Sequence, residues 1–178
     1  MRRSSRSAGL ALRVKFGRSW RVDETYLKVR GRWVYLYRAV DRDGDTVDFR
    51  LSPTRDVAAA KAFFRKALRT QKRAPVSITS DGYAASHRAV HEVRREDEEW
   101  KNTKLRSSKY LNNLIEQDQC GIKSRTGPML GFKNFGCAAT TIAGIELLRR
   151  IRKGQFVLGR LRLNNQTAPA IWNAVLAA

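Results

Sequence analysis

Residues 20–41 read WRVDETYLKVRGRWVYLYRAVD. Side chains that are β-branched, aromatic or aliphatic occupy most positions on both sides of Arg30-Gly31, and such residues favour strands. A glycine-containing pair between two apolar runs is typical of a hairpin turn. The stretch therefore predicts two long strands that fold back on each other and lie in the middle of a sheet.

The first of these strands carries two adjacent acids, Asp23 and Glu24. Because successive side chains of a strand point to opposite faces, Asp23 shares one face with Thr25 and Leu27, and Glu24 shares the other with Val22. A carboxylate in a buried strand is costly unless it is paired, hydrogen-bonded or bound to a metal. Asp23 therefore needs a partner, and both a structural and a functional role stay open.

The chain has 178 residues, enough for one well-buried domain, and its 36 Lys and Arg against 16 Asp and Glu give a formal net charge of +20. A surplus this large favours a polyanionic partner, with nucleic acid ahead of an anionic membrane, although purely structural nucleic-acid binding also fits. No apolar run approaches the roughly 18 residues of a membrane span. Cys120 and Cys137 form no closely spaced pair, which fits a reducing cytoplasm.

The rest of the chain alternates strand patterns with helical ones. Further strands are expected at residues 46–52, 76–80 and 100–105. Helices with an apolar stripe are expected at residues 57–72, 84–96, 110–125 and 135–153. Residues 1–19 are basic and irregular, and residues 156–178 have no clear assignment.

Two patterns have weak metal-binding character. His87 and His91 lie one helical turn apart without a third ligand nearby, so we expect surface residues. The acidic stretch 41–45 alternates Asp with other residues, but its glycine is misplaced for a calcium loop and no Glu closes it. A turn between two strands is the preferred interpretation of this stretch.

Two further places carry candidate ligand groups. Asp81 follows the expected strand 76–80 directly, at the carboxyl end where open α/β sheets place ligand groups, although it would also suit the cap of the next helix. In the expected helix 110–125, one face carries polar residues spaced to meet a DNA backbone. These residues are Asn112, Glu116, Gln119 and Lys123.

The order of elements, with Asp23 in the first strand, Asp81 after the fourth and Glu116 in the helix after the fifth, resembles the RNase H-like core of DDE transposases and retroviral-type integrases. Several motifs are similar to those of the IS-six family of replicative transposases. They are WRVDETY, GRWVYLYRAVD, the Asn112-Asn113 pair, Ile115-Glu116-Gln117-Asp118, Ile122-Lys123 with Arg125, and the GFK of residues 131–133. The resemblance covers most of residues 20–155.

This resemblance implies an α/β fold of the RNase H-like, retroviral integrase type, with a mixed five-stranded sheet flanked by helices. Residues 20–155 would form the DDE catalytic core, residues 1–19 a basic linker remnant, and residues 156–178 a C-terminal tail. Relatives carry an N-terminal helix-turn-helix module before the core, and we expect this chain to lack it.

The implied chemistry is metal-dependent cleavage at the 3′ ends of a mobile element, followed by attack of each freed 3′-hydroxyl on target DNA to give a cointegrate. Asp23, Asp81 and Glu116 would be the catalytic residues and the ligands of two Mg²⁺ ions, with Mn²⁺ as a substitute. The predicted DNA-binding residues are Asn112, Gln119, Lys123 and Arg125. The expected partners are DNA and further copies of the chain, in a homodimer or higher assembly at the cytoplasmic nucleoid.

The sequence departs from the family at three neighbouring positions. Gln119 stands where the family has a histidine, and Cys120 and Gly121 replace basic residues. Glutamine can donate a hydrogen bond to a phosphate but carries no charge. Two other functions therefore stay open: a non-catalytic, DNA-binding remnant that interferes with a full-length transposase, and a cellular RNase H-like nuclease.

Overall fold

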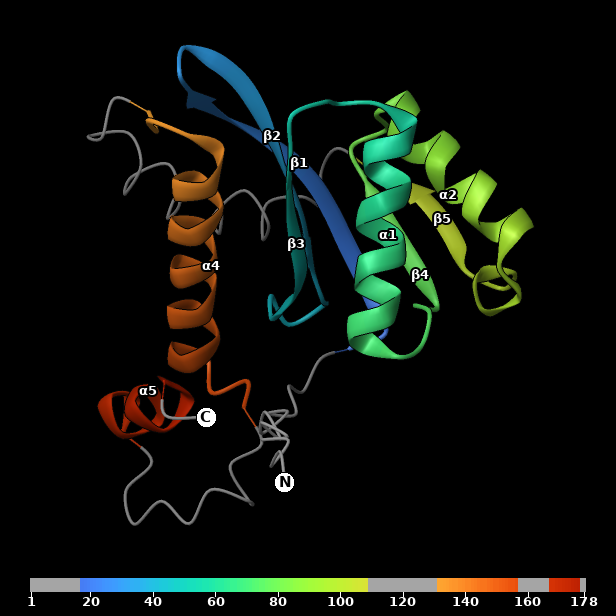
Figure 1. The fold of residues 1–178 in the computed structure, drawn as a ribbon. Helices are drawn as coiled ribbons and strands as arrows, with labels where there is room; N and C mark the ends of the chain where they lie inside the picture. The colour runs from blue at the N-terminus through green and yellow to red at the C-terminus, as the bar shows by residue number, and fades with distance from the viewer. Residues whose placement is uncertain (1–16, 109–130, 157–166, 177–178) are drawn as a thin grey trace, which may run out of the picture.

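The computed structural model describes residues 17–108, 131–156 and 167–176 (Figure 1). One five-stranded sheet has the strand order β3-β2-β1-β4-β5. The strands are β1 (Ser19–Val29), β2 (Arg32–Val40), β3 (Thr46–Ser52), β4 (Ser77–Ser80) and β5 (Lys104–Ser107). The helices are α1 (Val57–Gln71), α2 (Ala84–Glu96), the 3₁₀ turn η1 (Glu98–Trp100), α4 (Phe135–Arg152) and α5 (Ala168–Leu176).

The sheet is mixed, as predicted. β1 pairs antiparallel with β2, and β2 with β3, whereas β4 runs parallel to both β1 and β5. Arg30 and Gly31 join β1 to β2 with φ angles of 49° and 75°. Two successive residues with positive φ are typical of the tight hairpin turn whose twist matches that of the strands. The predicted hairpin and its turn are therefore confirmed.

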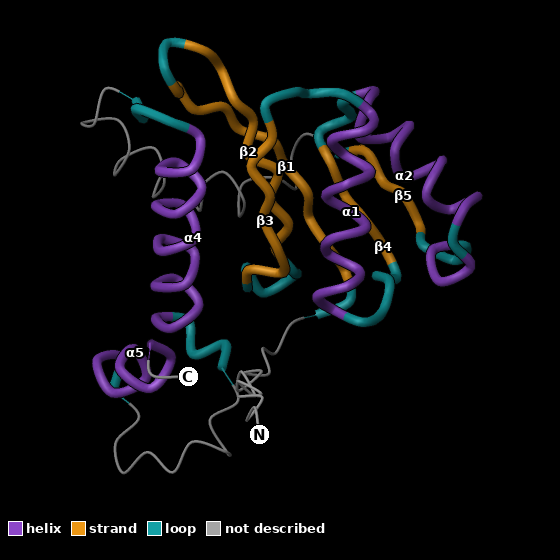
Figure 2. The backbone as a smooth tube through the Cα atoms, in the orientation of Figure 1, coloured by secondary structure: helices purple, strands orange, loops and turns teal. Residues whose placement is uncertain are grey.

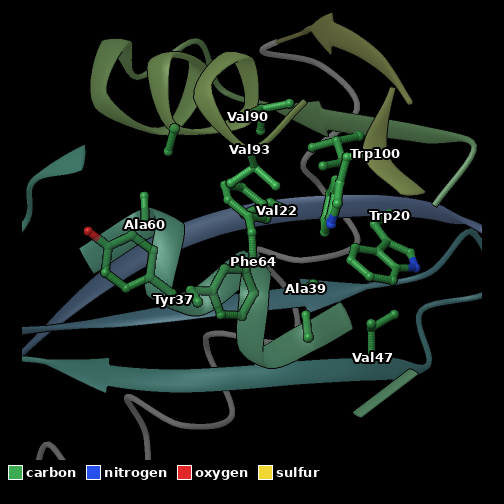
Figure 3. Packing of buried hydrophobic residues seen from close by; sticks show 14 of the residues in the cluster. Trp20, Val22, Tyr37, Ala39, Val47, Ala60, Phe64, Val90, Val93 and Trp100 are labelled. Atoms are coloured by element: carbon green, nitrogen blue, oxygen red, sulfur yellow. The ribbon is translucent and has the colours of Figure 1, made fainter. Parts of the chain in front are cut away.

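Helices cover both faces of the sheet, with α1 and α2 on one side and α4 on the other (Figures 1 and 2). The larger core lies beneath α1 and α2, and Figure 3 shows its aromatic centre. The Trp100 ring meets Trp20 and Phe64 edge-on, with ring centroids 5.9 Å and 5.8 Å apart. Such aromatic contacts stabilise a core beyond the apolar area that they bury.

A smaller core lies beneath α4. Leu27, Val34 and Leu36 of the hairpin pack there against Ala138 and Ile142 of the helix. The side chains of β1 therefore divide as alternation predicted, with Val22 under α1 and α2 and Leu27 under α4. Within the described ranges, no helix is long and apolar enough to span a bilayer.

The expected strand at residues 100–105 is wrong at its beginning, because β5 starts only at Lys104. The Asp97 side chain accepts a hydrogen bond from the Glu99 backbone N–H and begins the 3₁₀ turn η1 instead. Trp100 ends this turn with its side chain fully buried in the larger core. Burial of the indole thus outweighs the strand preference of an aromatic residue. The expected helix at residues 110–125 lies outside the described residues.

A buried ion pair ties α4 to the middle of the sheet. Arg38 of β2 and Glu146 of α4 approach to 2.9 Å between Nε and Oε1, and neither side chain is exposed. The Thr46 hydroxyl donates to the same carboxylate at 3.3 Å. Gln155, just after α4, exchanges two hydrogen bonds with the Thr46 backbone, each 3.2 Å long. The face under α4 is therefore polar at one end and apolar at the other.

A second set of ion pairs joins α1 to α2 at the surface. The Lys61 ammonium lies 3.0 Å from Glu92 and 2.5 Å from Glu96, and Arg65 lies 2.6 Å from Glu96. The hydrogen bonds from Lys61 hold the pKa of both glutamates below the ordinary value. These contacts fix the relative position of the two helices that cover the larger core.

We expect Glu146→Ala to lower the free energy of unfolding by about 3–5 kcal/mol, because the buried Arg38 charge would lose the Glu146 carboxylate. Urea unfolding measures this loss. The double variant Arg38→Met/Glu146→Leu should recover most of it, because neither charge then remains. A loss below about 1 kcal/mol in the single variant would contradict the burial of the pair.

The lowered pKa values predict a specific loss of stability in acid. A carboxyl group whose pKa is lower in the folded state stabilises the fold above its unfolded pKa, and this contribution disappears as the pH falls through the folded pKa. The thermal midpoint of the wild type should therefore fall more steeply below about pH 4.5 than that of Lys61→Met. Lys133→Met, at an exposed position, is the control and should follow the wild type.

Candidate active site

Two predicted site residues follow the same end of the parallel pairing of β1 with β4. The paired segment ends with Arg21 opposite Thr79. Asp23 and Asp81 each lie two residues further along. Asp81 lies just past the end of β4, while Asp23 lies within β1. Two residues that are far apart in the sequence thus follow the same end of one strand pair, which makes them candidates for a shared acidic site.

The two carboxylates differ in their surroundings. Asp23 is half-buried, lies on the face of β1 opposite α1 and α2, and accepts a hydrogen bond from the Glu24 backbone N–H at 2.8 Å. Asp81 is exposed and accepts one from the Tyr83 backbone N–H at 3.1 Å. The residue that caps α2 is Tyr83, so the capping role considered for Asp81 is wrong.

Glu24 sits behind this site, on the opposite face of β1, and its side chain is only 5% exposed. The Arg55 Nε donates to its Oε2 at 2.7 Å, and the Ser86 hydroxyl donates to its Oε1. Burial lowers the pKa of the Arg55 guanidinium, but the hydrogen bond and charge of Glu24 outweigh burial, and the pKa is raised. Glu24 therefore joins β1 to α2 and to the segment before α1.

The same cluster holds the chain just after Asp81. The Arg55 guanidinium carbon lies 3.6 Å from the centroid of the Tyr83 ring, and the Tyr83 hydroxyl donates to the Arg55 carbonyl at 3.2 Å. A cation stacked on an aromatic ring at this distance is an attractive contact. We call Glu24, Arg55, Tyr83 and Ser86 the clamp. It fixes the segment that carries Asp81 against the strand that carries Asp23.

His87 adds a further contact at the end of β4. Its Nε2 lies 2.8 Å from the hydroxyl of Ser80, the residue just before Asp81. His87 is half-buried and His91 is exposed. The sequence offered no local signal for this contact or for the clamp, because the clamp joins residues of β1, of the segment before α1 and of the beginning of α2.

The predicted residues Glu116, Asn112, Gln119, Lys123 and Arg125 lie outside the described residues. Among the residues that are described, no group of three or more His, Cys, Asp or Glu side chains comes together as a metal site. Asp23 and Asp81 nevertheless supply the hard carboxylate oxygens that Mg²⁺ prefers, and Mg²⁺ takes only one or two such groups in many sites. The two described donors therefore fit a divalent cation.

Residues 17–155 match the family described as a DDE domain. The chain is 37% identical over 139 residues to the transposase for insertion sequence-like element IS431mec of Staphylococcus aureus, which covers 75% of this chain and 58% of that protein. The transposase for insertion sequence element IS257 in transposon Tn4003, from the same species, matches with the same values. The chain thus spans little more than half the length of these curated relatives.

Solved structures of retroviral integrases share the fold. The catalytic core domain of HTLV-2 integrase in complex with magnesium, in its dimeric form, matches with a TM-score of 0.52 and 18% identity over 89% of this chain and 98% of that one. The catalytic core domain of BIV integrase matches with a TM-score of 0.52 and 13% identity over 90% and 97%. The predicted RNase H-like fold of the integrase type is therefore confirmed.

We expect Glu24→Ala to loosen the clamp, because Arg55 and Ser86 would lose their common acceptor. Hydrogen bonds to charged groups contribute about 1.5–3 kcal/mol, so the free energy of unfolding should fall by about this amount. Amide hydrogen exchange in residues 81–87 should become faster while α4 keeps its protection. The control Glu99→Ala, at an exposed position, should change neither quantity. Unchanged exchange in residues 81–87 of Glu24→Ala would show that Glu24 does not hold this segment.

Proposed function

Because the chain belongs to the DDE-domain transposase family, we propose that it catalyses the metal-dependent cleavage and joining of DNA strands. The observation that supports the proposal is that Asp23 and Asp81 both follow the last residue pair of the parallel β1–β4 pairing by two positions. Two carboxylates from separate elements at one edge of a sheet suit a site that holds metal ions against a phosphate.

Asp23, Asp81 and Glu116 would hold Mg²⁺, or Mn²⁺ in its place. When bound at such a site, the ions supply the charge that makes a water or a 3′-hydroxyl nucleophilic and that stabilises the departing oxyanion. The protein holds the carboxylates in position. The Glu24 and Tyr83 backbone N–H groups orient the two described carboxylates, and the clamp fixes the spacing between them.

Two phosphodiester reactions follow from this site. In the first, a water oxygen attacks the phosphorus at the end of the element, and the bond to the 3′ oxygen breaks to leave a 3′-hydroxyl. In the second, that hydroxyl attacks a phosphorus of target DNA and displaces a 3′ oxygen there. Each step exchanges one P–O bond for another, so neither a covalent enzyme intermediate nor a redox partner is needed.

The partners belong to the same proposal. A net charge of +20 favours a polyanion, and a DNA substrate meets this requirement. Asn112, Gln119, Lys123 and Arg125 remain the predicted contacts to the element ends. Two ends must be cut and joined together, which favours a dimer or larger assembly on DNA, at the nucleoid, and a cointegrate as the product.

Nicking of supercoiled plasmid tests the proposal. The wild type should nick in the presence of Mg²⁺ or Mn²⁺ and not in EDTA, and Asp81→Asn should reduce the rate by at least about a hundredfold, because a neutral amide holds a metal ion far less tightly. Asp43→Asn is the matched control, since it changes an exposed aspartate beside a turn glycine and should keep the wild-type rate.

Equal nicking by the wild type and Asp81→Asn would contradict the site, and absence of nicking in the wild type would leave a DNA-binding remnant as the function. A second assay separates a transposase from a nuclease. An oligonucleotide with a recessed element 3′ end should become joined to plasmid by the wild type. Nicking without any joined product would identify the chain as a nuclease.

A further inference from the structure

A second polar site lies on the same face of the sheet as Asp23, and nothing so far assigns it a role. A pocket of about 290 Å³ opens at the beginning of β1 and β4. Its lining combines guanidinium groups with hydroxyls on neighbouring strands. The residues are Ser19, Trp20, Arg21, Arg42, Ser77, Thr79 and Arg106.

The register of three parallel strands builds the floor of this pocket. Arg21 of β1 pairs with Thr79 of β4, and Thr79 pairs with Arg106 of β5. Their neighbours Trp20 and Ile78 lie in the core under α1 and α2, so the row itself faces the other side of the sheet. A threonine hydroxyl thus stands between two arginines at one level of the sheet.

The three guanidinium groups of the pocket have no acidic partner among the described residues. No ion pair or hydrogen bond involves the side chain of Arg21, Arg42 or Arg106 in that part of the chain. Arg42 stands between two acids in the sequence: Asp41 is buried and accepts backbone hydrogen bonds from Asp43 and Asp45, and Asp43 is exposed without an ion pair to Arg42 among the described residues. Three unpaired guanidinium groups around one pocket favour an anion with several oxygens, and a phosphate matches their planar donors.

The pocket also adjoins the carboxylates in a defined direction. Asp23 follows Arg21 by two residues on the same face of β1, which corresponds to about 7 Å along the strand. That distance is on the order of two 3.4 Å base-pair steps of duplex DNA. A DNA strand whose scissile phosphate lies at Asp23 and Asp81 therefore has a neighbouring phosphate within reach of the pocket.

We propose that Arg21, Arg42 and Arg106 form a binding site for a backbone phosphate of the DNA strand that enters the candidate active site. The inference rests on the proposed function, because that function makes DNA the ligand. The site positions the substrate without reading bases, since phosphate contacts carry no sequence information. No local sequence pattern predicts this site, because the three arginines come from three different parts of the chain.

A second basic pocket supplies a matched control. His91, Arg94, Arg95 and Lys101 line a pocket of about 280 Å³ on the outer side of α2. It belongs to a different face from Asp23, since α2 covers the larger core. Replacing Arg94, Arg95 and Lys101 removes as many charges as replacing the three arginines of the sheet pocket. The comparison therefore separates a local contact from the effect of net charge.

The experiment measures DNA affinity by fluorescence anisotropy with a labelled duplex in EDTA, so that no cleavage occurs, over a series of salt concentrations. Two triple variants are compared: Arg21→Gln/Arg42→Gln/Arg106→Gln in the sheet pocket and the control Arg94→Gln/Arg95→Gln/Lys101→Gln. The sheet-pocket variant should bind DNA on the order of tenfold more weakly than the control. The slope of its logarithmic affinity against logarithmic salt concentration should be smaller in magnitude by about 1, the value for one lost phosphate contact. Arg42→Gln alone, in an exposed turn, should reproduce part of the loss without affecting folding.

Equal losses of DNA affinity and of salt slope in the two triple variants would overturn the proposal, provided that circular dichroism shows both variants to be folded.

A free phosphate ion is the competing ligand. If inorganic phosphate raises the thermal midpoint of the wild type but not of the sheet-pocket variant, while DNA affinity is the same in both, the pocket binds small anions and the DNA assignment is wrong. The proposed function fails separately, when Asp81→Asn nicks like the wild type although the sheet-pocket variant has lost DNA affinity.

Discussion

Parallel pairing between β1 and β4 is the constraint on which the candidate site depends. The pairing sets Arg21 opposite Thr79, and Asp23 and Asp81 each follow that last pair by two residues. A shift of the β1–β4 register by one residue would change the relative position of the two carboxylates. It would also turn the Val22 side chain out of the larger core. Hydrophobic packing and the chemistry of the site therefore require the same register.

The two faces of β1 have different roles. On the side of α1 and α2, aromatic packing is reinforced by Glu24, whose buried carboxylate holds Arg55 and the start of α2 in place. On the other side, the Arg38–Glu146 pair anchors α4 over the hairpin, and the beginning of β1 and β4 carries the basic pocket. Rigid packing behind the sheet thus supports a charged surface in front of it, which suits a protein that must position a polyanion.

The parts of the fold that were predictable from the sequence depend on local patterns. The strand at residues 46–52 and the helix at residues 84–96 have the expected bounds, because alternation, helical periodicity and turn residues act over a few positions. Long-range polar contacts have no such pattern. Arg38 and Glu146 form an ion pair although they are 108 positions apart, and no sequence pattern near either residue predicts it. For Trp100 the tertiary core decided the local structure, against its strand preference.

The candidate site was predictable only through family resemblance joined to position in the sheet. Asp81 stood out because it follows a strand directly, and Asp23 because a carboxylate in a buried strand needs a partner, but only the family resemblance joined the two into one site. The measurement that tests the central claim most directly is anomalous diffraction at the manganese edge from crystals grown with Mn²⁺. The account predicts an anomalous peak within coordination distance of carboxylate oxygens of both Asp23 and Asp81. Manganese bound elsewhere in well-ordered crystals, with no peak between these two residues, would contradict it.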